Sequence, residues 1–225
     1  MVQAINTPLI ELINAGVDFA GEQCLAPLSF NVTRGEFVCL HGATGSGKTL
    51  ALNLISGLVR PTRGEVRVAG ELINDFNDRQ TLWLRRTMGI MAQDALLLDD
   101  RSILENVMLP ALASEESFSE ARRRARAALA ECDILDLADA RPSDISAGQK
   151  QIACLARAIV NHPVVILADE PAAHLDANNA QHLMDQLGEV SLSGVAVIVA
   201  SHLQLTPNTV ASRPIRLYAP AEMPS

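Results

Sequence analysis

Residues 42–49 read Gly42-Ala43-Thr44-Gly45-Ser46-Gly47-Lys48-Thr49, and this stretch decides the fold. A glycine, four further residues and then Gly-Lys-Thr form the pattern of a phosphate-binding loop. The apolar run before it, residues 36–40, predicts a buried strand. The run after it, residues 50–55, predicts a helix. The motif therefore has the strand–loop–helix context that it requires.

The residue types of this loop suit an anionic ligand. Glycines let the backbone wrap closely around an anion, and amides at the start of the following helix point at phosphate oxygens. Lys48 is placed to reach the terminal phosphates, and the hydroxyl of Thr49 is placed to bind Mg²⁺. The alternative, a glycine-rich turn that matches by chance, is disfavoured by the flanking strand and helix. We expect the loop to bind a nucleoside triphosphate.

Composition limits the class of protein. The chain has 225 residues, of which 48% are hydrophobic and only 3% aromatic, so the core must be mostly aliphatic. Such a core suits a buried parallel sheet covered by helices. A net charge of -8 argues against a nucleic-acid partner, because phosphate backbones need clustered positive charge, although a local patch stays possible. We expect no nucleic acid among the partners.

Cysteine usage and hydropathy indicate where the chain works. Its four cysteines, at positions 24, 39, 132 and 154, are scattered without a metal-binding spacing, which fits a reducing compartment. The N-terminus lacks the pattern of a signal peptide, and apolar runs such as residues 195–200 are too short to span a bilayer. We expect a cytoplasmic protein without direct membrane insertion, whose membrane role comes through a partner.

Hydrophobic periodicity divides the chain into strands, then helices, then strands and helices in alternation. Predicted strands cover residues 9–19, 25–32, 36–40, 65–68, 88–92, 164–168, 195–200 and 214–218. Predicted helices cover residues 50–55, 82–86, 103–112, 119–132, 146–160 and 178–187. Leu50, Leu54 and Leu58 are expected to share one face of the first helix.

The helix over residues 119–132 carries two further expectations. Ser119 is expected to cap it, with Glu120 in its first turn. The basic run from Arg122 to Arg126 is either a solvated helix face or a patch that faces a partner or lipid.

Two adjacent carboxylates follow the predicted strand 164–168. Asp169 is well placed for Mg²⁺, because it ends a buried strand beside the phosphate loop. Glu170 can accept a proton from an attacking water. The alternative, a pair of acidic residues that caps the next helix, is weakened by the phosphate loop.

The stretch Asp144-Ile145-Ser146-Ala147-Gly148-Gln149 resembles the Leu-Ser-Gly-Gly-Gln signature of ATP-binding cassette (ABC) ATPases. It lies between the phosphate loop and the acidic strand, which is the order found in that family. Other motifs agree: Gln93 resembles the Q-loop glutamine, Ala173-His174-Leu175-Asp176 the D-loop, and His202 the switch histidine. Phe19 resembles the aromatic residue that stacks on adenine, although a core position would also suit it.

The resemblance implies an α/β fold: an ABC-type P-loop NTPase core with an N-terminal antiparallel β subdomain and an inserted α-helical subdomain. Residues 1–225 would form one ABC ATPase domain, with 1–93 and 161–225 as the nucleotide-binding core and 94–160 as the helical subdomain. It also implies ATP as substrate and Mg²⁺ as cofactor.

The resemblance assigns a role to each candidate site residue. Lys48, Glu170 and His202 would be catalytic, His202 by holding Glu170 and the water in position. Thr49, Gln93 and Asp169 would hold Mg²⁺, and Phe19, Gln93 and residues 42–49 would hold ATP. The signature residues Ser146, Ala147, Gly148 and Gln149 would contact ATP held by a second subunit, so that two chains enclose two nucleotides. Asp176 would act in the D-loop.

The chain departs from the family pattern at several positions. Ala147 replaces the first glycine of the signature pair, Ile152 replaces a common arginine, and Leu203 replaces a common aspartate. Alanine cannot easily adopt a positive φ, so dimer closure would suffer if that position required one. These changes remove no catalytic group, but they favour slow or partner-dependent hydrolysis.

Residues 93–110 resemble one branch of the family, the cell-division ATP-binding proteins of the FtsE type. Here Asp100-Arg101-Ser102 precedes Glu105-Asn106-Val107 and then Met108-Leu109-Pro110. The resemblance implies a polytopic membrane partner, FtsX-like, and control of peptidoglycan hydrolases outside the membrane. Lipoprotein-releasing and macrolide-export ATPases share part of this stretch, so a transporter subunit is the alternative. A cassette that acts on DNA or ribosomes would usually carry inserted arms, zinc modules or a second cassette, which this sequence lacks.

Overall fold

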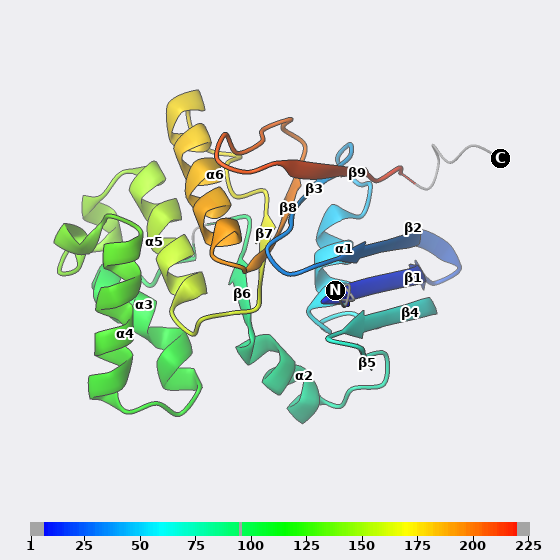
Figure 1. The fold of residues 1–225 in the computed structure, drawn as a ribbon, viewed down its shortest axis with the longest axis horizontal. Coiled ribbons are helices and arrows are strands. Elements are labelled where there is room, and N and C mark those ends of the chain that lie inside the picture. The colour runs from blue at the N-terminus through cyan, green and yellow to red at the C-terminus, as the bar shows by residue number, and fades with distance from the viewer. Residues whose placement is uncertain (1–6, 95, 220–225) are drawn as a thin grey trace, which may run out of the picture.

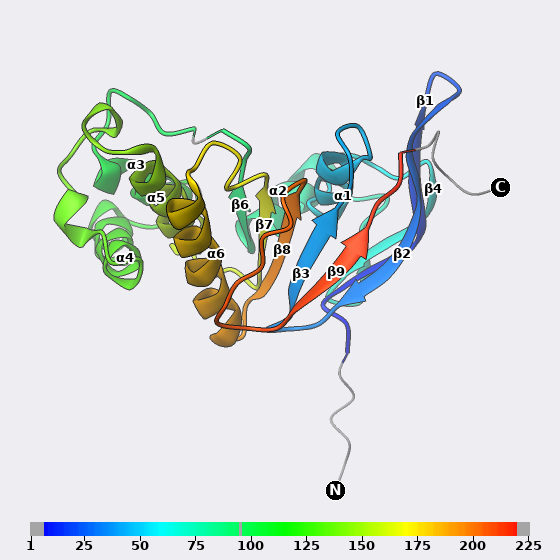
Figure 2. The same cartoon turned by 90° about the horizontal axis from the view of Figure 1, so that it is seen from above.

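The computed structural model describes residues 7–94 and 96–219. Its α/β fold contains an antiparallel sheet, a parallel sheet and a cluster of helices (Figure 1). The antiparallel sheet lies at one end of the molecule, the helices α3, α4 and α5 lie at the other, and the parallel sheet lies between them (Figures 1 and 2).

The antiparallel sheet has the strand order β2-β1-β4-β5. Its strands are β1 (Ile10–Phe19), β2 (Glu22–Val32), β4 (Arg63–Val68) and β5 (Glu71–Leu72). The connection between β1 and β2 is shorter than the predicted strands 9–19 and 25–32 allow for, because β2 begins three residues before the predicted Leu25. Ala20 and Gly21 both have positive φ, the geometry of a two-residue hairpin turn, so pairing resumes at Glu22.

The parallel sheet has the order β6-β7-β8-β3-β9 and carries the site. Its strands are β6 (Met88–Met91), β7 (Val165–Asp169), β8 (Ala196–Ser201), β3 (Phe37–His41) and β9 (Ser212–Arg216). Its three central strands are almost wholly buried, as their continuous apolar runs predict. The register pairs His41 with Ser201 and Asp169 with Ala200, so the carboxyl ends of β3, β7 and β8 meet at one edge.

Six α-helices complete the described fold: α1 (Lys48–Ile55), α2 (Asp78–Arg86), α3 (Ile103–Ala113), α4 (Phe118–Glu131), α5 (Ala147–Ile159) and α6 (Ala177–Leu192). Short 3₁₀ turns cover Leu135–Leu137 and Pro142–Asp144. Helices α3, α4 and α5 pack on one another around buried alanines and leucines such as Ala125, Leu129 and Leu155. No helix among the described residues is long and apolar enough to cross a bilayer.

Two helix predictions need correction. Leu58 does not share a face with Leu54, because α1 ends at Ile55, Gly57 follows with a φ of 70°, and Leu58 is 50% exposed. Ser117, not Ser119, caps α4, since its hydroxyl accepts a hydrogen bond from the Glu120 amide at 3.2 Å. The two serines lie within a turn of each other, so the sequence pattern did not distinguish them.

The basic run of α4 is partly neutralised by its own helix and the preceding turn. Arg123 and Arg124 both pair with Glu120, and Arg124 also pairs with Glu116. Hydrogen bonds from Arg123 and Arg124 lower the pKa of Glu120 to about 2. The arrangement fits the solvated-face interpretation of this run.

Candidate functional site: a nucleotide-binding centre

The phosphate-binding loop spans the gap between β3 and α1. Gly45 and Gly47 have φ values of 84° and 87°, and a Cβ on Gly47 would lie 2.4 Å from Leu25 Cδ1. Both positions therefore need glycine. Lys48 folds back over the loop, and its ammonium donates to the carbonyls of Gly42 at 2.9 Å and Ala43 at 3.3 Å. The hydroxyl of Ser46 is buried without a hydrogen-bond partner, so the loop retains a free donor for a ligand oxygen.

Glu170 forms the centre of a polar cluster. Its side chain accepts hydrogen bonds from the His202 amide at 3.0 Å and from the Ser201 hydroxyl at 3.2 Å. His202 Nδ1 lies 2.8 Å from Glu170 Oε2, and Lys48 Nζ lies 3.5 Å from Oε1. Glu170 is only 9% exposed and has a φ of 46°. A non-glycine residue in this conformation is uncommon.

Asp169 and Thr49 form a pair of oxygen ligands beside this cluster. The Thr49 hydroxyl donates to Asp169 Oδ2 at 2.7 Å, while Asp169 Oδ1 is buried without a partner. Burial raises the pKa of Asp169, a shift that the Thr49 hydrogen bond opposes and the charge of Glu170 reinforces. Carboxylate and hydroxyl oxygens fit Mg²⁺. Among the described residues, no group of three or more His, Cys, Asp or Glu could hold a metal, so phosphate oxygens and water would complete the shell.

These groups surround one cavity of about 370 Å³. It brings together residues that the sequence predicted from separate motifs: Thr44, Gly45, Gly47, Lys48, Thr49, Gln93, Asp169, Glu170 and His202. Cys24 and Leu50 also line it, and the sequence interpretation missed both. Cys24 lies on β2, whose contact with the loop through Gly47 depends on packing between the two sheets, and no motif marks it.

Phe19 is not a core residue. It ends β1 with its side chain 75% exposed, so the core alternative is wrong. It does not line the 370 Å³ cavity, although it lies on the hairpin that carries Cys24.

The signature residues lie elsewhere. Ser146 caps α5: its hydroxyl accepts from the Gln149 amide at 3.2 Å, and the Gln149 side chain accepts from the Ser146 amide at 2.8 Å. Helices α5 and α6 lie on one face of the parallel sheet and α1 lies on the other, and none of residues 146–149 lines the described cavity (Figure 2). The helix start at Ser146 therefore does not contribute to the cavity that the phosphate loop of the same chain lines.

The two small residues of the signature have different requirements. Ala147 is the first residue of α5, and its φ is not positive, so this structure requires no glycine there. Gly148 has less room, because a Cβ there would lie 2.7 Å from Asn179 Oδ1 on α6, and the Asn179 side chain would have to shift.

Asp176 follows β7 and caps α6. Its carboxylate caps α6 by accepting from the amides of Asn178 and Asn179, both at 3.0 Å. These hydrogen bonds, led by that from Asn179, lower the pKa of Asp176. The preceding His174 lies 4.0 Å from Asp94, next to Gln93 in the chain.

Comparisons with known proteins agree with this geometry. A family model described as ABC transporter matches residues 25–173. The cell division ATP-binding protein FtsE of Escherichia coli K12 is 37% identical over 182 residues, which cover 81% of this chain and 82% of the relative. The pyoverdine export ATP-binding/permease protein PvdT of Pseudomonas putida is 36% identical over 202 residues, which cover 87% of this chain but 31% of the relative.

Solved structures of ABC cassettes have the same fold. The dimeric structure of MJ0796, a bacterial ABC transporter cassette, matches with a TM-score of 0.82 and 32% identity, covering 93% of this chain and 94% of that one. A dimeric post-hydrolysis state of MJ0796 bound to ADP and Pi matches with a TM-score of 0.76 and 33% identity, covering 86% of this chain and 88% of that one.

Proposed function

Because this chain belongs to the ABC transporter family and is an ABC ATPase subunit, we propose that it powers a complex of the FtsE/FtsX type. The observation that carries this proposal is the extent of the match to FtsE, which covers 81% of this chain and 82% of that relative. The match to PvdT, whose name is that of an ATP-binding/permease protein, covers only 31% of that relative.

The chemistry follows from the polar cluster. Glu170 acts as the general base for the attacking water, because its carboxylate is held by Ser201 and by the His202 amide at the edge of the cavity. His202 positions Glu170 and contacts the γ-phosphate. Lys48 and the loop amides bind the phosphates, with Lys48 exchanging its contacts to the Gly42 and Ala43 carbonyls for phosphate oxygens.

The remaining site residues are proposed to hold Mg²⁺ and the adenine ring of ATP. Thr49, Asp169 and Gln93 bind Mg²⁺, which supplies charge neutralisation of the phosphates when bound. Phe19, exposed on the β1–β2 hairpin, stacks on adenine.

The working unit is a dimer. The 370 Å³ cavity is lined by the phosphate loop, Gln93 and the 169–170 pair, but not by the signature. A second copy supplies the helix start at Ser146, together with Asp176. The helix start then completes the anion-binding site for the γ-phosphate. The core then comprises the two sheets with α1, α2 and α6, and residues 94–160 form the inserted helical subdomain.

The proposed partner is an FtsX-like integral membrane subunit that holds this chain at the inner face of the cell membrane and regulates peptidoglycan hydrolysis. Co-expression with the membrane protein encoded beside it, followed by purification of the complex in detergent and an ATPase assay, tests this. An FtsX-like partner should co-purify and alter hydrolysis without any transported substrate.

The alternative is a subunit of a lipoprotein-releasing or efflux transporter, which the match to PvdT supports. A transporter permease in the purified complex, with hydrolysis stimulated by its substrate, would replace the first proposal with this one.

A further inference from the structure

Helix α5 holds a residue of the segment that follows Gln93. On α5, Arg157 Nη1 donates to the carbonyl of Leu96 at 2.5 Å. Leu96 is three residues from Gln93, which lines the cavity together with Asp169 and Glu170. The helix that begins with the signature serine is thus tied by one side chain to the segment that carries the proposed metal ligand.

A second tie holds the far end of the same loop. Asn106 on α3 is fully buried, accepts the Leu98 amide at 2.6 Å and donates to the carbonyls of Leu98 and Ser102 at 3.1 and 2.9 Å. Asn106 therefore fixes residues 98–102 to the start of α3. Arg157 instead fixes Leu96 to α5, and the two bonded residues lie 61 positions apart in the chain. Of these two ties, the Arg157 contact is the nearer to Gln93 in the chain.

We propose that Arg157 is a positioning residue for ATP hydrolysis: it sets the place of Gln93 in the Mg²⁺–nucleotide site by holding the Leu96 carbonyl. The inference rests on the proposed role of Gln93. A guanidinium suits this task because it is rigid, always charged and strongly hydrogen-bonding to a carbonyl, whereas lysine presents only a single point of charge.

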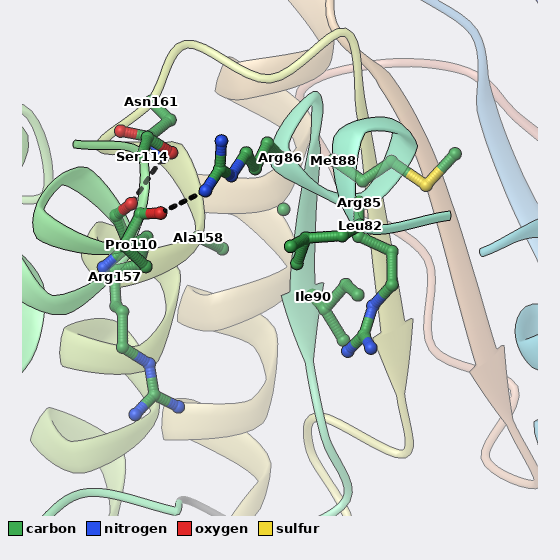
Figure 3. Close-up of a pocket in the computed structure, with 12 residues that line it drawn as sticks. Leu82, Arg85, Arg86, Met88, Ile90, Pro110, Ser114, Arg157, Ala158 and Asn161 are labelled. Atoms are coloured by element: carbon green, nitrogen blue, oxygen red, sulfur yellow. Dashed lines mark hydrogen bonds between the residues drawn. The ribbon is translucent and has the colours of Figure 1, made fainter. Parts of the chain in front are cut away.

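Arg157 is also reachable from the surface. It lines a cavity of about 330 Å³ between the helical cluster and α2. Figure 3 shows Arg157 extending from α5 on one side of this cavity and Arg85 extending from α2 on the other. Near its upper end, Arg86 donates to the Ala113 carbonyl and Asn161 donates to Ser114, so that part is already hydrogen-bonded. A shortened side chain at 157 would leave space into which free guanidinium can diffuse.

A double-mutant cycle tests the proposal. ATP hydrolysis is measured against Mg²⁺ and ATP concentration for the unaltered chain, Arg157→Met, Gln93→Ala and the double variant. We expect Arg157→Met to lower kcat by roughly 10-fold to 100-fold, the usual effect of misplacing a site group by about 1 Å. It should raise the Mg²⁺ concentration needed for half-maximal rate and leave the KM for ATP nearly unchanged. In the Gln93→Ala background, Arg157→Met should have no further effect.

Equal losses in both backgrounds would overturn the inference, since Arg157 would then act independently of Gln93. A Gln93→Ala variant with normal Mg²⁺ dependence would overturn the proposed role of Gln93 itself, a distinguishable result. Arg126→Met, an exposed arginine on α4, is the matched control and should leave all parameters unchanged. Millimolar guanidinium should partly restore Arg157→Ala but not Gln93→Ala; absence of rescue, with the melting temperature unaltered, would count against a positioning role.

Discussion

Glu170 has the surroundings that a general base requires. Two hydrogen-bond donors hold its carboxylate, His202 Nδ1 lies 2.8 Å away, and the residue adopts a left-handed backbone conformation that directs it toward the cavity. Glu170→Gln keeps the shape but removes the proton acceptor, so ATP should still bind while hydrolysis falls by about 10²–10⁴-fold. Phosphate release measures the hydrolysis rate, and a nucleotide titration measures ATP binding. Full activity in this variant would move the base role elsewhere, with His202 the nearest candidate.

Lys48 is the residue through which the ATP-binding part of the proposed site can be tested. It is almost buried and makes charge-assisted contacts with two loop carbonyls and with Glu170. Lys48→Ala should weaken ATP binding by roughly 10-fold to 100-fold, because the phosphates lose a charged partner worth about 1.5–3 kcal/mol. Titration calorimetry with an ATP analogue that the protein cannot hydrolyse measures this loss of affinity. Lys150→Ala is the control, since Lys150 is the other lysine of the chain, and an equal affinity in both variants would contradict the assignment of Lys48.

Asp169 should show a conflict between stability and function. Burial raises its pKa, so the folded chain binds that proton more readily than the unfolded chain does. The cost of the buried charge is therefore present at neutral pH and disappears as the pH falls through the raised pKa toward 3.8, the ordinary value. Asp169→Asn should melt at a higher temperature at pH 7.5, with a gain that shrinks as the pH falls toward 3.8, and should lose Mg²⁺-dependent hydrolysis. Asp139→Asn, at an exposed position, is the control. If the gain in melting temperature of Asp169→Asn grew as the pH fell, the raised pKa of Asp169 would be contradicted.

At the scale of elements, Asn106 holds α3 and the 98–102 segment together through its buried amide. Asn106→Ala leaves the Leu98 amide and carbonyl without their partner, so unfolding free energy should fall by about 1–3 kcal/mol. Denaturant titration measures this change. Asn178→Ala, at an exposed position of α6, should change stability by less than about 0.5 kcal/mol. A similar effect in the two variants would mean that the Asn106 contacts contribute little.

The sequence predicted most elements because buried parallel strands and capped helices have strong local signals. Residues 164–168 and 195–200 became β7 and β8 with shifts of one residue, and the helix predicted from Ser146 begins at Ala147 with Ser146 as its cap. Local signals failed where neighbouring residues could serve equally, as with Ser117 and Ser119, or where the end of a helix removed a residue from its face, as with Leu58. Contacts between distant segments, such as Cys24 beside Gly47 and Arg157 at Leu96, have no sequence period and appear only in the folded chain.

For the whole molecule, the arrangement divides one proposed ATP site between two places. The phosphate loop and Glu170 lie at the edge of the parallel sheet, while Ser146 caps α5, which packs on the face of that sheet opposite α1 (Figure 2). Closure of two copies would bring each loop opposite the partner's signature. In the proposed cycle the nucleotide would hold the dimer shut and hydrolysis would let it open, and in this way the chain would pass the energy of ATP to a membrane partner.

The most direct measurement is the mass of the Glu170→Gln chain in solution, by light scattering, with and without ATP and Mg²⁺. The account predicts a monomer without nucleotide and a dimer with it. Adding Ser146→Asp should abolish the dimer while one ATP still binds per chain, because aspartate caps a helix as well as serine does but repels phosphate. Ser117→Asp at the start of α4 is the matched control and should dimerise normally. A chain that stays monomeric with ATP bound, or that dimerises equally with Ser146→Asp, would contradict the composite site.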